Sequence, residues 1–213
     1  MLVGIECGGT HTTVATAASA ADPRPTPTQF QLGPANFRLT TPDGFAALFT
    51  EAFGRIEEAP AAIGLAVAGA RHPEQHQALE AMLRAALGGL GGWQEAVSAT
   101  IPVRASHDLD SALLATGPLD ASTPRLVCIA GTGSACYGRR GSRGREVRGG
   151  GWGHLLGDEG SGFMLGSGLL RLLTVRADRA RRSGADACPL TKRVLKAAGL
   201  GDDPAGWDGM IGW

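Results

Sequence analysis

Short apolar runs alternate with stretches of helical period along the chain, and this alternation predicts an α/β fold. Runs of strand length occupy residues 2–5, 13–18, 29–32, 61–68, 101–105, 125–130, 135–139 and 145–148. Helical spacing predicts helices over residues 43–58, 74–87, 111–116, 161–180 and 190–198, the first of them capped by Asp43. The unbroken apolar run at 61–68 is typical of a strand that is covered on both faces, and residues 125–130 are predicted as another buried strand.

Residues 149–162 combine glycines, a tryptophan and two acids immediately ahead of a predicted helix. They read Gly-Gly-Gly-Trp-Gly-His-Leu-Leu-Gly-Asp-Glu-Gly-Ser-Gly and include Asp158 and Glu159. Glycines allow positive φ angles and let a backbone approach a ligand closely. A surface turn with a helix cap would explain any one of these glycines, but the whole stretch favours a loop that contacts a ligand. Within it, Trp152 is expected either to line the ligand site or to fill the core.

Two predicted hairpins, far apart in the sequence, carry similar glycine–threonine tips. The first tip is Glu6-Cys7-Gly8-Gly9-Thr10, and the second is Gly131-Thr132-Gly133-Ser134. Backbone N–H groups and hydroxyls at such tips can bind phosphate oxygens, and Glu6 can hold a hydrated Mg²⁺ ion. Either motif alone also fits an ordinary hairpin. Together they suggest two related half-molecules that face each other, each binding phosphates with its tip. The chain has no Gly-x-x-x-x-Gly-Lys-Ser/Thr sequence, which excludes a P-loop NTPase.

Asp108 is the candidate general base, because it closely follows the strand predicted at residues 101–105. Sheets of α/β proteins bind ligands at the carboxyl ends of their parallel strands. Asp110 fits better as an acidic residue at the start of the next helix. His107 is either catalytic or an exposed residue of the turn. Asn36 follows a Gly-Pro-Ala segment, where its amide would read a hydroxyl or amide of a ligand or would stabilise its own turn.

Composition narrows the functional classes. Lys and Arg together number 20, as do Asp and Glu, so the formal net charge is zero and nucleic acid is not an expected partner. The basic clusters at residues 139–148 and 176–182 are expected to lie in solvent. No leader and no run of about 18 apolar residues is found, which predicts a cytoplasmic protein without a membrane span. The four cysteines lack the spacing of a zinc site.

In order and spacing, these motifs resemble those of the N-acetylglucosamine kinase group, also called the BadF/BadG/BcrA/BcrD type, of the sugar kinase–Hsp70–actin superfamily. The matching segments span essentially the whole chain and are residues 6–10, 33–36, 107–108, 131–134 and 150–161, the last being the most specific. The resemblance implies a ribonuclease H-like (actin-like ATPase) fold in which two domains close over a cleft. The expected domains are a complete one over residues 1–117 and a truncated one over residues 118–213.

The resemblance also implies an enzyme that phosphorylates an amino sugar, N-acetylglucosamine or glucosamine, with ATP and Mg²⁺. Asp108 would be the general base, and Glu6 would hold the metal ion through water. The expected residues around the ATP phosphates are Gly8, Gly9, Thr10, Gly131, Thr132 and Gly133. Those expected around the sugar are Asn36, Asp108, Ser134, Gly151, Trp152, Gly153 and Asp158. A homodimer is a candidate assembly.

Departures from the family pattern keep alternatives open. Cys7 replaces a glycine, and Ala135 replaces an asparagine that contacts the sugar, which leaves recognition of the acyl group undecided. The chain also stops before the family's adenosine-binding glycine motif, so its second sheet should have an open edge and an uncovered apolar face. One alternative is therefore a non-catalytic sugar-binding or regulatory remnant. Another is the ATPase that activates 2-hydroxyacyl-CoA dehydratases, in which Cys128 and Cys136 would bridge an iron–sulfur cluster between subunits, although one would lie in a buried strand.

Overall fold

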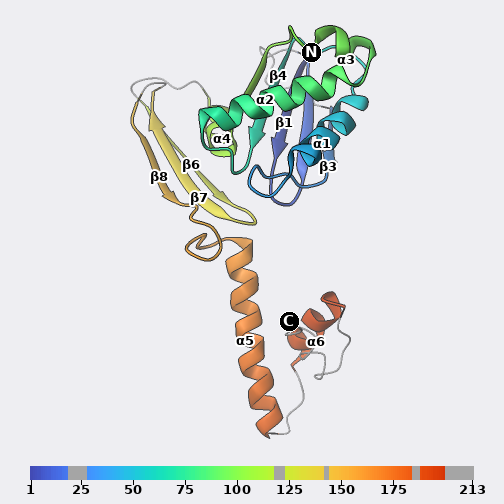
Figure 1. The fold of residues 1–213 in the computed structure, drawn as a ribbon. Helices are drawn as coiled ribbons and strands as arrows, with labels where there is room; N and C mark the ends of the chain where they lie inside the picture. The colour runs from blue at the N-terminus through green and yellow to red at the C-terminus, as the bar shows by residue number, and fades with distance from the viewer. Residues whose placement is uncertain (19–27, 118–122, 142–143, 184–187, 200–213) are drawn as a thin grey trace.

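A computed structural model describes residues 1–18, 28–117, 123–141, 144–183 and 188–199. In these residues the chain forms a five-stranded mixed sheet and a three-stranded antiparallel sheet, with helices packed on them or projecting away (Figure 1). The α/β class and all eight predicted strands are confirmed. The actin-like assignment and the domain boundary at residue 118 stay predictions.

The larger sheet has the strand order β3-β2-β1-β4-β5. The first three strands form an antiparallel meander, whereas β4 and β5 run parallel to β1, so the carboxyl ends of β1, β4 and β5 lie at one edge. Its strands are β1 (Leu2–Cys7), β2 (Thr12–Ala17), β3 (Thr28–Leu32), β4 (Ala62–Val67) and β5 (Val103–His107). The helices that accompany it are α1 (Pro42–Gly54), α2 (Pro73–Gly88) and the short α3 (Gly92–Val97), which was not predicted.

Helix α1 supplies the centre of the main core. Phe45, Phe49 and Phe53 recur every four residues, so they share one face of the helix, and all three are buried in the same cluster as the sheet residues Ile5 and Leu65. The predicted cap was wrong. The Oγ1 atom of Thr41 accepts a hydrogen bond from the N–H of Gly44 at 3.2 Å, whereas Asp43 lies in the first turn. Pro42 explains the shift, because proline favours the first helical position and places the cap one residue earlier.

The smaller sheet has the order β6-β7-β8 and is attached to the rest by helix α4. Its strands are β6 (Pro124–Ala130), β7 (Ser134–Arg140) and β8 (Glu146–Gly150), and α4 spans Asp108–Ala115. Leu109 and Leu113 of α4 are buried together with Tyr137 of β7, and Val127 packs against them.

The opposite face of the smaller sheet is uncovered in the part of the chain that the structure describes. The side chain of Leu126 is 65% exposed, and Val147 is also exposed. The prediction that residues 125–130 form a buried strand was therefore wrong for one face, because α4 covers only the other. The expected uncovered apolar face is confirmed.

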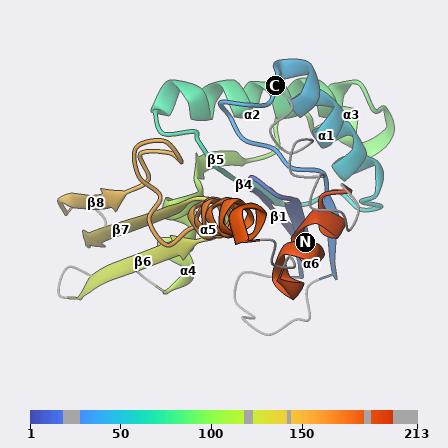
Figure 2. The same ribbon diagram turned by 90° about the horizontal axis from the view of Figure 1, so that it is seen from below.

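Helices α5 (Gly162–Ser183) and α6 (Pro189–Ala197) follow the smaller sheet, and α5 is attached by its first residues to the turn between β6 and β7. Figures 1 and 2 show α5 projecting away from the smaller sheet, with α6 beside it. The two helices share a small core around Leu173 and Leu195, while Leu165 and Leu172 are exposed. No helix among the described residues is both long enough and apolar enough to span a membrane.

We predict that the contact between α4 and the smaller sheet limits the stability of that sheet. Leu113→Ala removes a fully buried side chain and should lower the free energy of unfolding by about 2–4 kcal/mol. Hydrogen exchange should accelerate most in β6 and β7. Leu114→Ala is the matched control, because its side chain is 54% exposed and the change should cost much less. Equal losses in the two variants would contradict the assigned contact.

Candidate active site

The two glycine–threonine tips meet. The hydroxyl oxygens of Thr10 and Thr132 lie 2.7 Å apart, at hydrogen-bond distance, although 122 positions separate them in the sequence. Gly9 also faces Thr132, since a Cβ atom at Gly9 would lie 3.7 Å from the Cβ of Thr132. Both threonines are exposed, so their hydroxyls and the neighbouring backbone remain accessible. The structure thus brings together the two motifs from which the sequence analysis predicted phosphate binding.

The second tip is held by the start of helix α5. The N–H of Gly162 donates to the carbonyl of Gly131 at 2.7 Å, and the N–H of Phe163 donates to the carbonyl of Thr132 at 3.3 Å. Ser134 Oγ donates to the carbonyl of Glu159 at 2.8 Å. The Ser134 hydroxyl, predicted to contact a sugar, therefore braces the loop between β8 and α5 in this structure.

That loop requires unusual backbone conformations. Gly150, Gly151, Gly153 and Gly160 all have positive φ angles, which glycine adopts at little cost. Asp158 has a φ of 62° and is the only described residue other than glycine with a positive value. Such a conformation persists only where the surroundings hold it in place.

Asp158 is held by contacts on both of its carboxylate oxygens. Its side chain is buried, and Oδ1 accepts a hydrogen bond from the N–H of Gly153 at 3.3 Å. Oδ2 lies so close to Gly133 that a Cβ atom at that glycine would be 2.9 Å away. The carboxylate therefore joins the glycine-rich loop to the second tip. Trp152, by contrast, is 75% exposed, so of its two expected positions the one in the core was wrong.

Asp108 lies where β5 ends and α4 begins. Helix α4 starts three residues earlier than predicted, with His107 as its N-cap and both Asp108 and Asp110 in its first turn. The Oδ1 atom of Asp108 accepts from the N–H of Leu109 at 2.9 Å and lies 2.8 Å from Nδ1 of His107. His107 is only 9% exposed, so the alternative of an exposed turn residue was wrong.

These contacts determine the charge state of Asp108. Burial works to raise its pKa, but the hydrogen bond and charge of His107 and the N–H of Leu109 together lower the pKa below the usual range of an aspartate. Asp108 is therefore ionised at neutral pH and can accept a proton or a hydrogen bond.

Glu6 ends up near Asp108, although about a hundred positions separate them in the chain. Burial raises the pKa of Glu6, and the charge of Asp108 raises it further, while His11 acts in the opposite direction. Two neighbouring carboxylates suit a hard divalent cation such as Mg²⁺. Among the described residues, no group of three or more His, Cys, Asp or Glu side chains is arranged around a common metal position.

Asn36 lies at the same edge of the larger sheet. The N–H of Ala35 donates to the carbonyl of Gly8 at 3.1 Å, and the N–H of Phe37 donates to that of Ala68 at 2.9 Å, so the segment is fixed to the ends of β1 and β4. Asn36 Oδ1 accepts from the N–H of Arg38 at 2.9 Å. This oxygen stabilises its own turn, as one of the two readings expected, and the amide nitrogen is the group suited to donate to a ligand.

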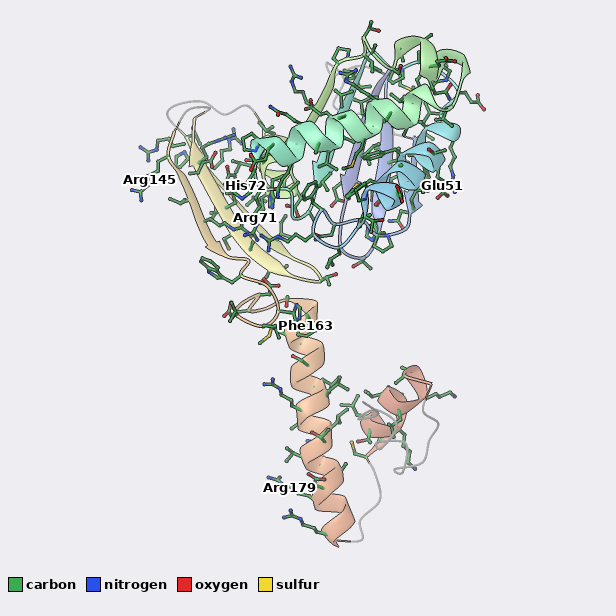
Figure 3. All side chains as sticks on the ribbon, viewed as in Figure 1. Glu51, Arg71, His72, Arg145, Phe163 and Arg179 are labelled. Atoms are coloured by element: carbon green, nitrogen blue, oxygen red, sulfur yellow. The ribbon has the colours of Figure 1, made fainter. Side chains whose placement is uncertain are left out.

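Sequence reasoning missed two arginines. Nη2 of Arg71, from the segment between β4 and α2, donates to the carbonyl of Gly151 at 2.9 Å. Nη2 of Arg148, from β8, approaches the same carbonyl at 3.4 Å. Figure 3 shows Arg71 between the start of α2 and the smaller sheet. Arg148 had been assigned to a solvated cluster. Its position two residues before Gly150 was a usable signal, because it precedes the glycine-rich loop directly.

Cys128 and Cys136 are register partners on β6 and β7, with their sulfur atoms 3.1 Å apart. Both are free and exposed, so Cys128 is not in a buried strand as expected. Their side chains face each other within one chain.

Comparison with known proteins identifies a relative among the sugar kinases. The chain is 33% identical, over 172 residues, to the N-acetylmuramic acid/N-acetylglucosamine kinase of Clostridium acetobutylicum. The predicted resemblance to kinases of the N-acetylglucosamine type is confirmed. The alignment covers 78% of this chain and 50% of the relative, so the chain spans half the length of that curated kinase. No protein-family model matches the chain.

A solved structure extends the comparison to the fold. A protein from Porphyromonas gingivalis, provisionally assigned as an N-acetylglucosamine kinase, superposes with a TM-score of 0.63 over 94% of this chain and 62% of its own. At 22% sequence identity this likeness shows a shared fold and no more.

We predict that Gly69 positions Asn36. Gly69 has a φ of +84°, and a Cβ atom there would lie 2.5 Å from Asn36 Oδ1. Gly69→Ala should therefore displace the Asn36 segment and lower the free energy of unfolding by about 1–3 kcal/mol, the usual range for strain of this kind. Gly33→Ala is the control, because a Cβ at Gly33 meets no atom within 4 Å. Thermal unfolding of both variants measures the difference, and a Gly69 variant as stable as the control would refute the steric argument.

Proposed function

We propose that this chain takes part in the ATP-dependent phosphorylation of a hydroxyl group on an amino sugar, with Asp108 as the general base. The observation that carries the proposal is the contact between the two tips at Thr10 and Thr132, together with the electrostatic effect of Asp108 on Glu6 of the first tip motif. Phosphoryl transfer depends mainly on positioning and on neutralising charge. In this proposal the two tips supply the positioning, and a divalent cation held near Glu6 would supply the charge neutralisation.

Each predicted residue has a role in this proposal. The N–H groups of Gly9 and Gly133 and the hydroxyls of Thr10 and Thr132 bind the ATP phosphates. Gly8 and Gly131 shape the two tips around those phosphates, because their N–H groups donate to the carbonyls of His11 and Gly133. Asp108 accepts the proton of the attacking hydroxyl. Glu6 holds Mg²⁺ through water, and that ion, when bound, offsets the charge of the phosphates.

The remaining residues form the proposed sugar side of the site. Asn36, Gly151, Trp152, Gly153 and Asp158 surround the sugar, and Ser134 supports their loop through its bond to Glu159. The Asp158 carboxylate orients sugar hydroxyls through charge-assisted hydrogen bonds. The proposed substrates are N-acetylglucosamine and glucosamine, to which the relative's name adds N-acetylmuramic acid.

The cysteine geometry disfavours one alternative. An activator of 2-hydroxyacyl-CoA dehydratases would use Cys128 and Cys136 as ligands of a cluster shared between subunits. Here the two sulfur atoms are directed at each other, 3.1 Å apart, on adjacent strands of one chain. This arrangement favours pairing within the chain over bridging between chains.

A direct assay tests the proposed function. The purified protein would be incubated with Mg–ATP and each of N-acetylglucosamine, glucosamine and N-acetylmuramic acid, with sugar phosphate measured by mass spectrometry. We expect phosphate transfer to at least one of them. Calorimetric titration of each sugar and of Mg–ATP accompanies the assay. Sugar binding with no transfer would instead support the non-catalytic remnant.

Asp108→Asn should reduce turnover by about 10²–10⁴-fold, which is the usual contribution of a positioned base. Sugar affinity should change far less, because the amide keeps the size and most hydrogen bonds of the carboxylate. Since the pKa of Asp108 is lowered, activity of the parent should fall only as the pH drops below the usual carboxylate range. Asp110→Asn is the matched control from the same helical turn. Turnover within a few-fold of the parent in Asp108→Asn would exclude Asp108 as the base.

Asp158 is predicted to bind sugar and not the metal ion. Asp158→Asn tests this, because asparagine tolerates a positive φ and keeps an oxygen to accept from the N–H of Gly153. Loss of the charge should weaken sugar binding by about tenfold or more, while the Mg²⁺ dependence of turnover stays the same. Glu159→Gln serves as the control, since only its backbone carbonyl holds the loop. An altered Mg²⁺ requirement with normal sugar affinity would reverse the assigned role.

A further inference from the structure

Two guanidinium groups from opposite sides of the candidate site converge on one backbone oxygen. Arg71 follows β4 of the larger sheet, and Arg148 belongs to β8 of the smaller one. Their Nη2 atoms lie 2.9 Å and 3.4 Å from the carbonyl oxygen of Gly151. Gly151 has a φ of +69°, and a Cβ atom there would lie 2.5 Å from Arg148 Nη2, so the arginine packs directly against the loop.

This pair of cations has no carboxylate partner at contact distance. Among the residues that the structure describes, neither Arg71 nor Arg148 forms an ion pair. Burial lowers the pKa of Arg71, and the charges of Arg148 and Arg38 act in the same direction, while the charges of Asp108 and Asp158 act against them. One neutral carbonyl shared by two cations leaves most of their donor capacity unused, because each guanidinium carries five N–H groups. An anion placed between them would satisfy both.

The position of the pair indicates which ligand brings that anion. Gly151 belongs to the loop that Asp158 closes, on the proposed sugar side, whereas the proposed phosphate-binding groups are at Thr10 and Thr132. We propose that Arg71 and Arg148 together form a subsite for a carboxylate carried by the sugar, so that the chain selects an acidic amino sugar over a neutral one. This inference rests on the proposed function, since it assigns a substrate class to the same site.

The chemistry of arginine fits a carboxylate. Its planar fork can donate two parallel hydrogen bonds to one carboxylate, and two such forks can approach that group from different sides. Hydrogen bonds between an ionised donor and an ionised acceptor are stronger than bonds between neutral groups, so an acidic sugar gains an interaction here that its neutral analogue lacks.

Calorimetry without ATP tests the subsite directly. N-acetylmuramic acid and N-acetylglucosamine serve as the probes, because they share the amino-sugar ring and differ by an ether substituent that ends in a carboxylate. For the parent chain we expect tighter binding of the acidic sugar. Arg148→Gln should weaken binding of the acidic sugar by about 10–100-fold and thereby remove the preference, since a hydrogen bond to a charged group is lost. Arg71→Gln should act in the same way, which provides a second variant if one of them fails to fold.

Arg145→Gln is the matched control. Arg145 precedes β8 and lies at the outer end of the smaller sheet, away from Arg71 (Figure 3). Its variant should keep the preference for the acidic sugar.

Three results would overturn the subsite. The parent chain could bind both sugars equally. The Arg148 variant could lose affinity for both sugars in the same proportion, which would mean that it only supports the loop. The variants could lose affinity for Mg–ATP and keep the sugar preference, which would assign the pair to phosphate.

Failure of the kinase proposal gives a different result. Selective, arginine-dependent binding of the acidic sugar without phosphate transfer would refute the catalytic proposal and leave the subsite in place. Phosphate transfer to neutral sugars, with no arginine-dependent preference for the acidic sugar, would refute the subsite and leave the catalytic proposal in place.

Discussion

Helix α4 is attached to the larger sheet at its start and packs on the smaller sheet with its apolar face, and the candidate site depends on this double contact. It begins at Asp108, directly after the last residue of β5, so its first turn is fixed to the edge of the larger sheet. Its apolar face buries Leu109 and Leu113 against Tyr137 of the smaller sheet. Because the same short helix carries the proposed base and the contact between the sheets, moving the smaller sheet would change the distance from Asp108 to the second tip.

The glycine-rich loop closes the arrangement from the other side. Asp158 accepts from the N–H of Gly153 and packs against Gly133, and the N–H groups at the start of α5 hold the carbonyls of the second tip. Conformations with positive φ are unfavourable for residues other than glycine, so these contacts must compensate for the one adopted by Asp158. The geometry of the second tip and the geometry of the loop are therefore not independent. A substitution that alters the second tip should therefore also displace the glycine-rich loop, and the converse should hold.

Sequence patterns were sufficient for the strands and for the grouping of most candidate residues. The apolar runs gave all eight strands, and the tip motifs predicted the meeting of Thr10 and Thr132. The start of α4 was misplaced because Asp110 was interpreted as the acidic residue at the helix start, whereas the helix begins at Asp108. The buried spacing of Leu109 and Leu113 becomes evident only against the second sheet.

Arg71 and Arg148 could not be paired from the sequence. The position of Arg148 before the glycine-rich loop was a local signal, but Arg71 lies far away in the sequence and carries none. The same holds for the uncovered face of the smaller sheet. An apolar run such as residues 125–130 shows that a strand is fit for burial, but not whether another element of the described chain covers it.

The environments of Glu6 and Asp108 argue for separate roles in the proposed reaction. Both are carboxylates near each other, and their mutual repulsion alone would raise the pKa of each. Asp108 escapes this effect because His107 and the N–H of Leu109 stabilise its anion, whereas burial and the charge of Asp108 raise the pKa of Glu6. The environment with its own hydrogen-bond donors suits a group that must stay ionised while a hydroxyl approaches. The environment of Glu6, whose pKa is set by burial and by neighbouring charges, suits a carboxylate whose charge is balanced by a cation. Pairs of titratable groups whose surroundings push their pKa values apart are the pattern expected where two carboxylates divide the work of one reaction.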